Sequence, residues 1–259
     1  MTSFDIASLV AVAIFASGAL GLVLQRLLPK PHTSDRSRDM IGSVVGTTTL
    51  LLALVLGLLI WTAYGVYTAQ KTGLQSLVSG ALQFDQALME YGPEANGGRA
   101  LLKKEATGDR RQFWDGNVSG GSLPYSEALA NVSTSLANMR ERDGFLDTLQ
   151  PTTELQKRLL GAARQLTTSM GQTRLAMSLQ MDSPVPWPLL AIVISLSLLL
   201  FCGAGLLSQM NATTLTSMAF GAFSVASAIF LILELNQPYT GLFHVSSAAF
   251  EQITEDLAK

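Results

Sequence analysis

The stretch Leu215–Leu235, which reads LTSMAFGAFSVASAIFLILEL, decides the fold of this chain. Its single charged residue, Glu234, lies at the far end. About 20 apolar residues rising about 1.5 Å each span the roughly 30 Å hydrocarbon core of a bilayer. The stretch therefore predicts a transmembrane helix, with expected bounds of about 213–235.

Three other stretches share this apolar character. They predict spans at about 6–28, 41–67 and 188–207. Only 14% of the 259 residues are charged and 48% are hydrophobic, whereas about a quarter of a typical soluble domain is charged. The sequence thus predicts an all-α membrane protein whose four transmembrane helices form two hairpins in contact with the lipid bilayer.

The polar segment between the second and third spans predicts a helical extramembrane domain. Apolar residues at three- and four-residue steps extend the second helix to Tyr91, and Gly92-Pro93 ends it. A stripe from Leu155 to Met177 predicts a long last helix. The expected divisions are a first hairpin, the helical domain, a second hairpin and an amphipathic C-terminal helix, at residues 1–67, 68–184, 185–240 and 241–259.

Charges next to the spans predict the orientation. Asp5 precedes the first span, and Arg26 and Lys30 follow it, which is the reverse of a signal peptide, so we expect this helix to be retained. The loop after it carries four Lys or Arg residues, against three near the spans on the other side. By the positive-inside rule this loop lies in the cytoplasm, and both termini and the helical domain lie outside.

Composition and motifs argue against several classes of function. The net charge of −2 and the lack of a basic stripe argue against a nucleic-acid partner. Cys202 is the only cysteine, and His32 and His244 are about 210 residues apart, so we expect no metal site. The common phosphate-binding, metalloprotease and serine-hydrolase motifs do not occur. We therefore expect neither an enzyme activity nor a cofactor.

Three blocks of sequence carry a family resemblance. They are Leu28-Pro29 with His32, Asp39 and Ala53–Leu59; Tyr91–Ala95 with Arg99 and Leu101-Leu102; and Asn211–Thr213 with Ala228–Leu235, Gln237–Tyr239, Gly241-Leu242 and Ser246-Ser247. In these blocks the chain resembles the bacterial bestrophin-like domain family. The likeness to bestrophins implies an oligomeric anion channel with four spans per subunit. We expect the chain in the bacterial plasma (inner) membrane, and the positive-inside rule places its helical domain in the periplasm. Asn236 stands where the closing motif of the family is expected to have an aspartate.

The fourth span carries the main candidate pore residues. Glu234 is the only carboxylate inside a span, and such residues often mark ion or proton pathways. The residues that precede it at three- and four-residue steps are Phe220, Phe223, Ser227 and Phe230. In an oligomer this face predicts an apolar constriction with a ring of carboxylates at its mouth. The alternatives are an interfacial cap for Glu234 and ordinary helix packing for the aromatic residues.

Two smaller features are also candidates. Thr49, in the threonine run of the second span, could line a water-filled pore. The alternative is a hydrogen bond from its hydroxyl to a backbone carbonyl in the preceding turn, which is usual for threonine in a membrane helix. His32 and Asp39 form a His/carboxylate cluster in the first loop. This cluster predicts either a metal or proton-sensing site, or an interfacial loop in which Asp39 caps the next helix.

Two functions from different classes fit these features. The first is a subunit of a homo-oligomeric ion channel or pore, with anions as the ions that the family likeness implies. A single four-span subunit encloses little room for water, so this function requires several copies. The second is a non-conducting membrane sensor or scaffold that acts through its helical extramembrane domain. A channel needs polar faces from several spans to meet on one axis, whereas a scaffold needs an exposed apolar patch on the domain.

Overall fold

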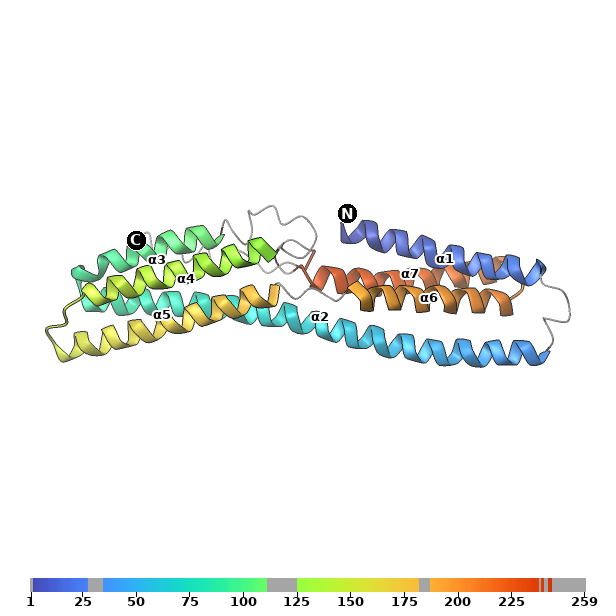
Figure 1. Ribbon diagram of the computed structural model, residues 1–259, viewed down its shortest axis with the longest axis horizontal. Helices are drawn as coiled ribbons and strands as arrows, with labels where there is room; N and C mark the ends of the chain where they lie inside the picture. Colours follow the sequence, from blue (N-terminus) through green and yellow to red (C-terminus); the bar gives the residue numbers. More distant parts are fainter. Residues whose placement is uncertain are drawn as a thin grey trace. The chain divides into compact units, whose positions relative to one another are not determined.

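The computed structural model describes residues 2–27, 35–110, 125–181, 187–237, 239 and 242–243. Within these ranges the chain forms helices joined by turns and no β-strand (Figure 1). Four helices are long and apolar enough to cross a membrane, at Ser3–Leu27, Arg38–Tyr91, Trp187–Leu207 and Ala212–Leu235. The predicted all-α membrane fold is therefore confirmed. The amphipathic helix predicted at 241–259 lies outside the described residues, apart from Leu242 and Phe243.

The chain divides into two compact units. The membrane unit comprises Met1–Gly65 and Val185–Asn236, and the helical unit comprises Val66–Pro184 and Gln237–Lys259. Helix α2 (Asp35–Tyr91) is 57 residues long and contributes to both units. The second predicted span thus continues as one helix into the helical unit.

Helix α2 ends at Tyr91, as the sequence predicts. Gly92 has a φ of 126°, which L side chains rarely adopt, so the position favours glycine. Pro93 follows it and has no backbone N–H to extend the helical hydrogen bonding. The Gly92-Pro93 pair therefore ends the helix, because Gly92 adopts a non-helical backbone conformation and Pro93 lacks a hydrogen-bond donor.

The membrane unit contains α1 (Ser3–Leu27), the first part of α2, α6 (Trp187–Leu207) and α7 (Ala212–Leu235). Helix α1 packs against both α6 and α7. A short turn joins α6 to α7 and ends in a helix cap. There the Oδ1 atom of Asn211 accepts from the backbone N–H of Thr214 at 2.8 Å, which satisfies a donor that the first turn leaves unpaired.

Glycines bring α1 and α6 into close contact. A Cβ atom on Gly21 would collide with the backbone carbonyl of Cys202, and a Cβ on Gly205 would lie 3.0 Å from the Cα of Gly21. Beside this contact the hydroxyl of Ser17 donates to the carbonyl of Leu198 at 2.7 Å. Small residues allow apolar helices to approach this closely, and the gain in van der Waals contact holds them together in lipid.

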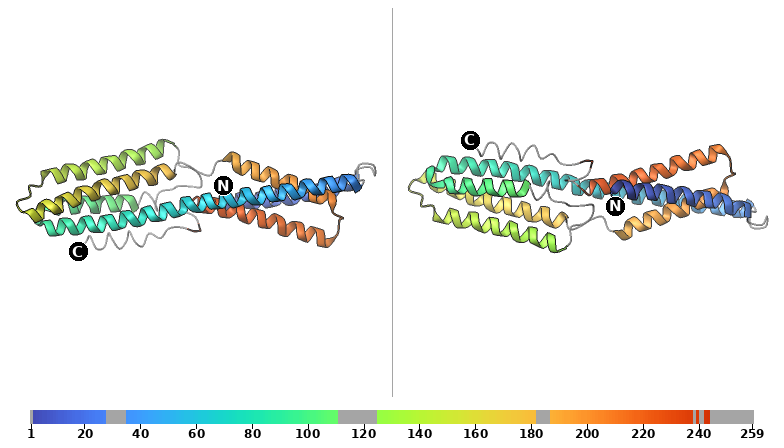
Figure 2. Two further views of the ribbon diagram at one scale, coloured as in Figure 1. Left: turned by 90° about the horizontal axis from the view of Figure 1, so that it is seen from below. Right: turned by 90° about the horizontal axis from the view of Figure 1, so that it is seen from above.

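The helical unit contains the second part of α2, the 3₁₀ turn η2 (Pro93–Ala95), α3 (Asn96–Arg110), α4 (Tyr125–Thr148) and α5 (Glu154–Met181) (Figure 2). Helix α4 packs against α3 and α5. The largest apolar side chains of its core are fully buried: Phe84, Leu88, Leu102, Leu146 and Met177.

Two methionine–glycine contacts join α2 to α5. A Cβ on Gly73 would lie 2.8 Å from the Sδ atom of Met177, and a Cβ on Gly80 would lie 2.9 Å from the Cγ atom of Met170. The flexible methionine side chains occupy the space that the missing Cβ atoms leave. The two helices are therefore direct neighbours along about two turns of each.

The buried face of α5 differs from the predicted stripe. Leu155, which the stripe includes, is 61% exposed, whereas Ala163, Thr167 and Arg174 are buried. Met170 and Met177 of the predicted stripe lie in the core, and Leu159 and Leu166 pack against it. The stripe thus identifies the packed side of α5 in part, but it omits the buried polar residues Thr167 and Arg174.

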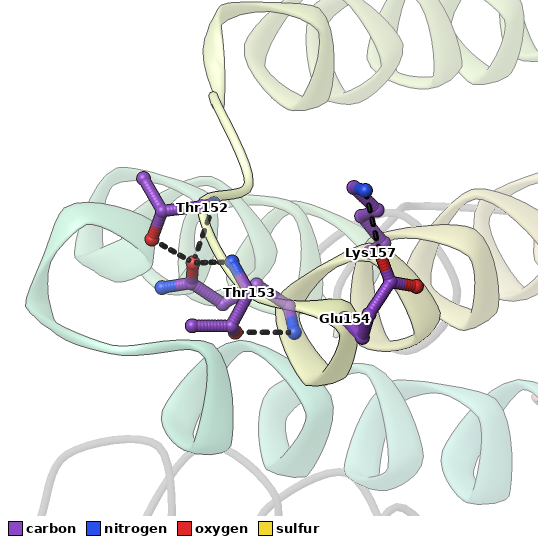
Figure 3. Close-up of polar contacts among 5 residues, drawn as sticks. Thr152, Thr153, Glu154 and Lys157 are labelled. Atoms are coloured by element: carbon purple, nitrogen blue, oxygen red, sulfur yellow. Dashed lines mark hydrogen bonds and ion pairs between the residues drawn. The ribbon is translucent and has the colours of Figure 1, made fainter.

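A capping box begins α5 (Figure 3). The hydroxyl of Thr153 accepts from the backbone N–H of Gln156 at 3.1 Å, and the Oε1 atom of Gln156 accepts from the backbone N–H of Thr153 at 3.3 Å. The Nε2 atom of Gln156 also donates to the carbonyl of Tyr91 at 3.2 Å. One amide therefore caps the start of α5 and satisfies a carbonyl at the end of α2.

Candidate functional site

Glu234 lies near the C-terminal end of α7 and is buried within the chain. Its residue surface is 7% exposed, and its helix neighbours Ile232 and Leu235 are buried as well. The helix ends one residue later at Leu235, followed by Asn236. Glu234 is therefore a carboxylate held inside the membrane unit rather than one that projects from its surface.

The other members of the predicted pore face on α7 lie in a different environment. Phe220 is 70% exposed and Phe223 is 68% exposed. Ser227 is exposed too, and its hydroxyl donates to the carbonyl of Phe223 at 2.8 Å, while Phe230 is half-buried. The predicted continuous face is thus exposed in its first half and becomes buried at Glu234.

Thr49 lies on the membrane part of α2 and is exposed. Its hydroxyl donates to the carbonyl of Val45 at 2.8 Å, and the hydroxyl of Thr47 likewise donates to the carbonyl of Ser43 at 3.0 Å. These are bonds to the preceding turn, the local arrangement expected of threonine in a membrane helix. Each hydroxyl oxygen still keeps a lone pair directed away from the helix, so the surface remains polar at these points.

The membrane part of α2 is the span that the rest of the chain covers least. Only 11% of its apolar window is buried, compared with 33% for α1 and α6 and 39% for α7. Leu50, Leu54 and Trp61 are each 70% exposed or more. A Cβ built on Gly46 or Gly57 would meet nothing within 4 Å. Sequence reasoning missed this difference between the spans, because all four are equally apolar.

The first-loop cluster is only partly described. His32 lies outside the described residues, and Asp39 is exposed on α2. The prediction that Asp39 caps this helix was wrong, because α2 begins four residues earlier, at Asp35. Among the described residues no group of three His, Cys, Asp or Glu side chains is placed to hold a metal ion. The neighbouring Arg38 instead donates to the carbonyl of Leu207 at 3.1 Å, at the end of α6.

A buried ionic cluster lies in the helical unit and was missed by the sequence reasoning. The Oε2 atom of Glu105 on α3 is 3.0 Å from Nη1 of Arg142 on α4 and 2.9 Å from Nη1 of Arg174 on α5. The side chains are 4%, 0% and 6% exposed in that order. A sequence signal exists, since Arg174 falls on the helical face of α5 that also contains Thr167 and Met170. Breaking such a buried ion pair lowers the free energy of unfolding far more than breaking an ion pair at the surface.

A second buried polar group joins the end of the chain to the helical unit. The phenol of Tyr239 donates to Oε1 of Gln70 at 2.9 Å, and Nε2 of Gln70 donates to the carbonyl of Met177 at 3.0 Å. Gln70 is 0% exposed and Tyr239 is 9% exposed. Burial raises the pKa of the Tyr239 phenol above its ordinary value, because the charged phenolate would lose its hydration there.

One bidentate ion pair fastens α3 to α2. Nε of Arg99 lies 2.6 Å from Oδ1 of Asp85, and Nη2 lies 3.2 Å from Oδ2. The hydrogen bonds to Asp85 raise the pKa of Arg99. The pair therefore fixes the angle at which α3 leaves the end of α2.

Comparisons with known proteins agree on one fold. The family model described as Bestrophin-like domain matches residues 11–250. A crystal structure of a point mutant of a bacterial Bestrophin homolog from Klebsiella pneumoniae is similar with a TM-score of 0.69 at 13% identity, covering 96% of this chain and 97% of that chain. Another point mutant of the same protein has a TM-score of 0.68 at 12% identity, with 99% and 97% covered. No curated protein matches the sequence.

Proposed function

Because the chain belongs to the bestrophin-like domain family, we propose that it is one subunit of a homo-oligomeric ion channel or pore. The family and the four apolar helices make it a multi-pass bacterial membrane protein. The observation that carries the channel proposal is the uncovered membrane part of α2, of which 11% is buried.

An uncovered span can face lipid or other copies of the chain, and two features of α2 favour other copies. Thr47 and Thr49 expose hydroxyl oxygens, which hydrocarbon solvates poorly. Gly46 and Gly57 have open space above them, as needed for close approach of a neighbouring helix. Several α2 helices around one axis would enclose a path with polar positions on its wall, which a single four-span protomer does not provide.

The candidate residues on α7 have separate parts in this proposal. Phe220, Phe223 and Ser227 face outward and are available to meet another copy. Glu234 lies behind this face. When it is ionised, its carboxylate favours cations and disfavours anions in a nearby path of low dielectric. An anion-selective pore would therefore conduct better after Glu234→Gln, and a cation-selective pore would conduct worse.

The experiment combines two measurements on the full chain. The first is the oligomeric mass of the detergent-purified protein, and the second is current in planar bilayers after reconstitution. A defined oligomer with unitary currents, whose selectivity changes in Glu234→Gln, is the expected result. A monomer, or an oligomer that stays silent in bilayers, would refute the channel proposal and favour the non-conducting scaffold.

We also propose that the helical unit lies on the periplasmic side. A cysteine introduced at the exposed position Thr107 of α3, in a Cys202→Ser background, should react with a membrane-impermeant thiol reagent in intact spheroplasts. Labelling only after lysis would show that the helical unit lies on the cytoplasmic side instead.

A further inference from the structure

Methionine side chains occupy glycine notches at three places in the described part of the helical unit. Two of these contacts join α2 to α5 through Met170 and Met177. The third joins α4 to α5, where a Cβ on Gly171 of α5 would lie 2.6 Å from the Sδ atom of Met139 on α4. Helix α5 is thus packed against both α2 and α4 through methionine side chains that lie directly on a helix backbone.

The three methionines differ in their access to solvent. Met170 and Met177 are 3% and 2% exposed, whereas Met139 is half-buried. The neighbours of Met139 on α4, Ala137 and Arg140, are exposed, so Met139 lies at the edge of the contact between α4 and α5. A small solute can therefore reach Met139 in the folded protein, while the other two sulfur atoms become accessible only when the helices open.

The fit of Met139 at Gly171 depends on an apolar, unmodified sulfur atom. The wall of this notch is helix backbone, whose N–H groups donate within α5 and are not available to another acceptor. An oxygen atom added to the sulfur would be a polar acceptor without a donor at this wall. It would also enlarge a side chain that already lies in close contact, which forces the two helices apart. The sulfoxide of Met139 is therefore incompatible with the packed arrangement.

We propose that Met139 is an oxidation site, at which a peroxide converts the thioether to the sulfoxide and loosens α4 from α5. One oxygen of hydrogen peroxide forms a bond to Sδ while the O–O bond breaks; the sulfur loses two electrons, and the peroxide is reduced to water. A methionine sulfoxide reductase reverses the step with electrons from thiols and releases the oxygen as water. The site operates in the helical unit whether or not the chain conducts ions.

Oxidation of Met139 should expose the two buried methionines in turn. Once α4 separates from α5, helix α5 loses one of its two packed neighbours, so the openings that uncover Met170 and Met177 become more frequent. The three sulfur atoms should therefore be oxidised in order, with Met139 first. This order makes the unit respond to a sustained exposure to peroxide more strongly than three independent methionines would.

The first test follows this order by mass spectrometry. The full chain carrying Cys202→Ser, which removes its one thiol, is treated with hydrogen peroxide in detergent, and the gain of oxygen at each methionine is measured over time. Met89 is 59% exposed on α2 and gives the rate for an accessible methionine. Met170 and Met177 should react at least about tenfold more slowly than Met139 until Met139 is oxidised. A Met139 that stays unmodified after Met89 is fully oxidised would overturn the proposal.

The second test compares Met139→Leu with Met89→Leu, its matched control, in the same background. Leucine keeps an apolar side chain of similar volume and is not oxidised by peroxide. Peroxide should lower the melting temperature of the parent and of Met89→Leu by at least about 4 °C, and treatment with the reductase should restore it. Met139→Leu should keep its melting temperature, and its Met170 and Met177 should stay reduced.

Two results would overturn the proposal. One is an equal fall of the melting temperature in both variants, and the other is a parent whose melting temperature is unchanged after the sulfoxide of Met139 has formed. If Met139→Leu does not fold, the time course of the parent decides. The melting temperature must then fall with the oxidised fraction of Met139, and a fall that follows the oxidised fraction of Met89 instead would overturn the proposal.

Discussion

Replacing Glu105 with glutamine should destabilise the helical unit strongly. The change keeps the side-chain size but removes the negative charge from an oxygen that lies 3.0 Å from Arg142 and 2.9 Å from Arg174. All three side chains are at most 6% exposed, so water does not replace the lost interaction. Removing one partner of a buried ion pair costs about 3–5 kcal/mol. At about 2–4 °C for each kcal/mol in a chain of this size, the melting temperature should fall by roughly 6–20 °C.

The adjacent residue Lys104 is a matched control on the same helix. Its ammonium group lies 3.3 Å from Glu141, but its side chain is 71% exposed. After allowance for solvent screening, Lys104→Gln should cost less than about 1 kcal/mol and shift the melting temperature by less than about 4 °C. Thermal unfolding of the detergent-purified protein, followed by circular dichroism at 222 nm, measures both variants. Equal shifts for the two variants would refute the argument that burial of the cluster determines its contribution.

A double-mutant cycle separates the interaction between Glu105 and Arg142 from nonspecific destabilisation of the fold. Arg142→Met removes one guanidinium and retains much of its buried aliphatic volume. The double variant with Glu105→Gln should lose about 0.5–3 kcal/mol less than the sum of the two single losses, since the residues are in direct contact. Strict additivity would mean that the two residues do not interact in solution.

Three further substitutions have expected outcomes. Gly21→Ala should separate α1 from α6 and reduce the yield of monodisperse protein on size-exclusion chromatography. Gly57→Ala is the control, because a Cβ there meets nothing within 4 Å, and it should leave the yield unchanged. Equal yields for the two variants would contradict the close contact. Tyr239→Phe leaves the buried Oε1 of Gln70 without that donor and should cost about 1–3 kcal/mol in thermal unfolding near neutral pH. Because the pKa of Tyr239 is raised, the phenol stays protonated in the folded state at pH values where it is deprotonated in the unfolded state. The free energy of unfolding of the wild type should therefore fall above about pH 10, and that of the phenylalanine variant should fall less over the same range. Thr153→Ala removes the cap of α5 and should cost about 1 kcal/mol, and an unchanged melting temperature would show that the capping box is not formed.

The uncovered part of α2 shows what a hydropathy pattern omits. Each of the four spans has a window of mean hydropathy between 2.0 and 2.6, so the pattern treats them alike. The buried fraction of those windows varies from 11% to 39%, because α1 packs on both α6 and α7. Hydropathy measures the free energy of leaving water and does not distinguish lipid from a neighbouring helix.

The pore candidates on α7 show the same limit at the level of single residues. Spacing alone places Phe220, Phe223, Ser227, Phe230 and Glu234 on one stripe. The helix packs along a line that crosses this stripe, so its first half is exposed and Glu234 is buried. The direction of that line depends on the partner helices, which the spacing within α7 does not contain.

The sequence by itself determined the elements that depend on neighbouring residues. Uninterrupted apolar runs specify the spans, and the Gly92-Pro93 pair specifies the end of α2, because backbone hydrogen bonding and transfer from water to lipid act locally. Only the tertiary structure decided that Glu105, Arg142 and Arg174 meet, and that Tyr239 bonds to Gln70. Those contacts join residues that are 37 to 169 positions apart, and their free energy exists only once the helices have packed and excluded water.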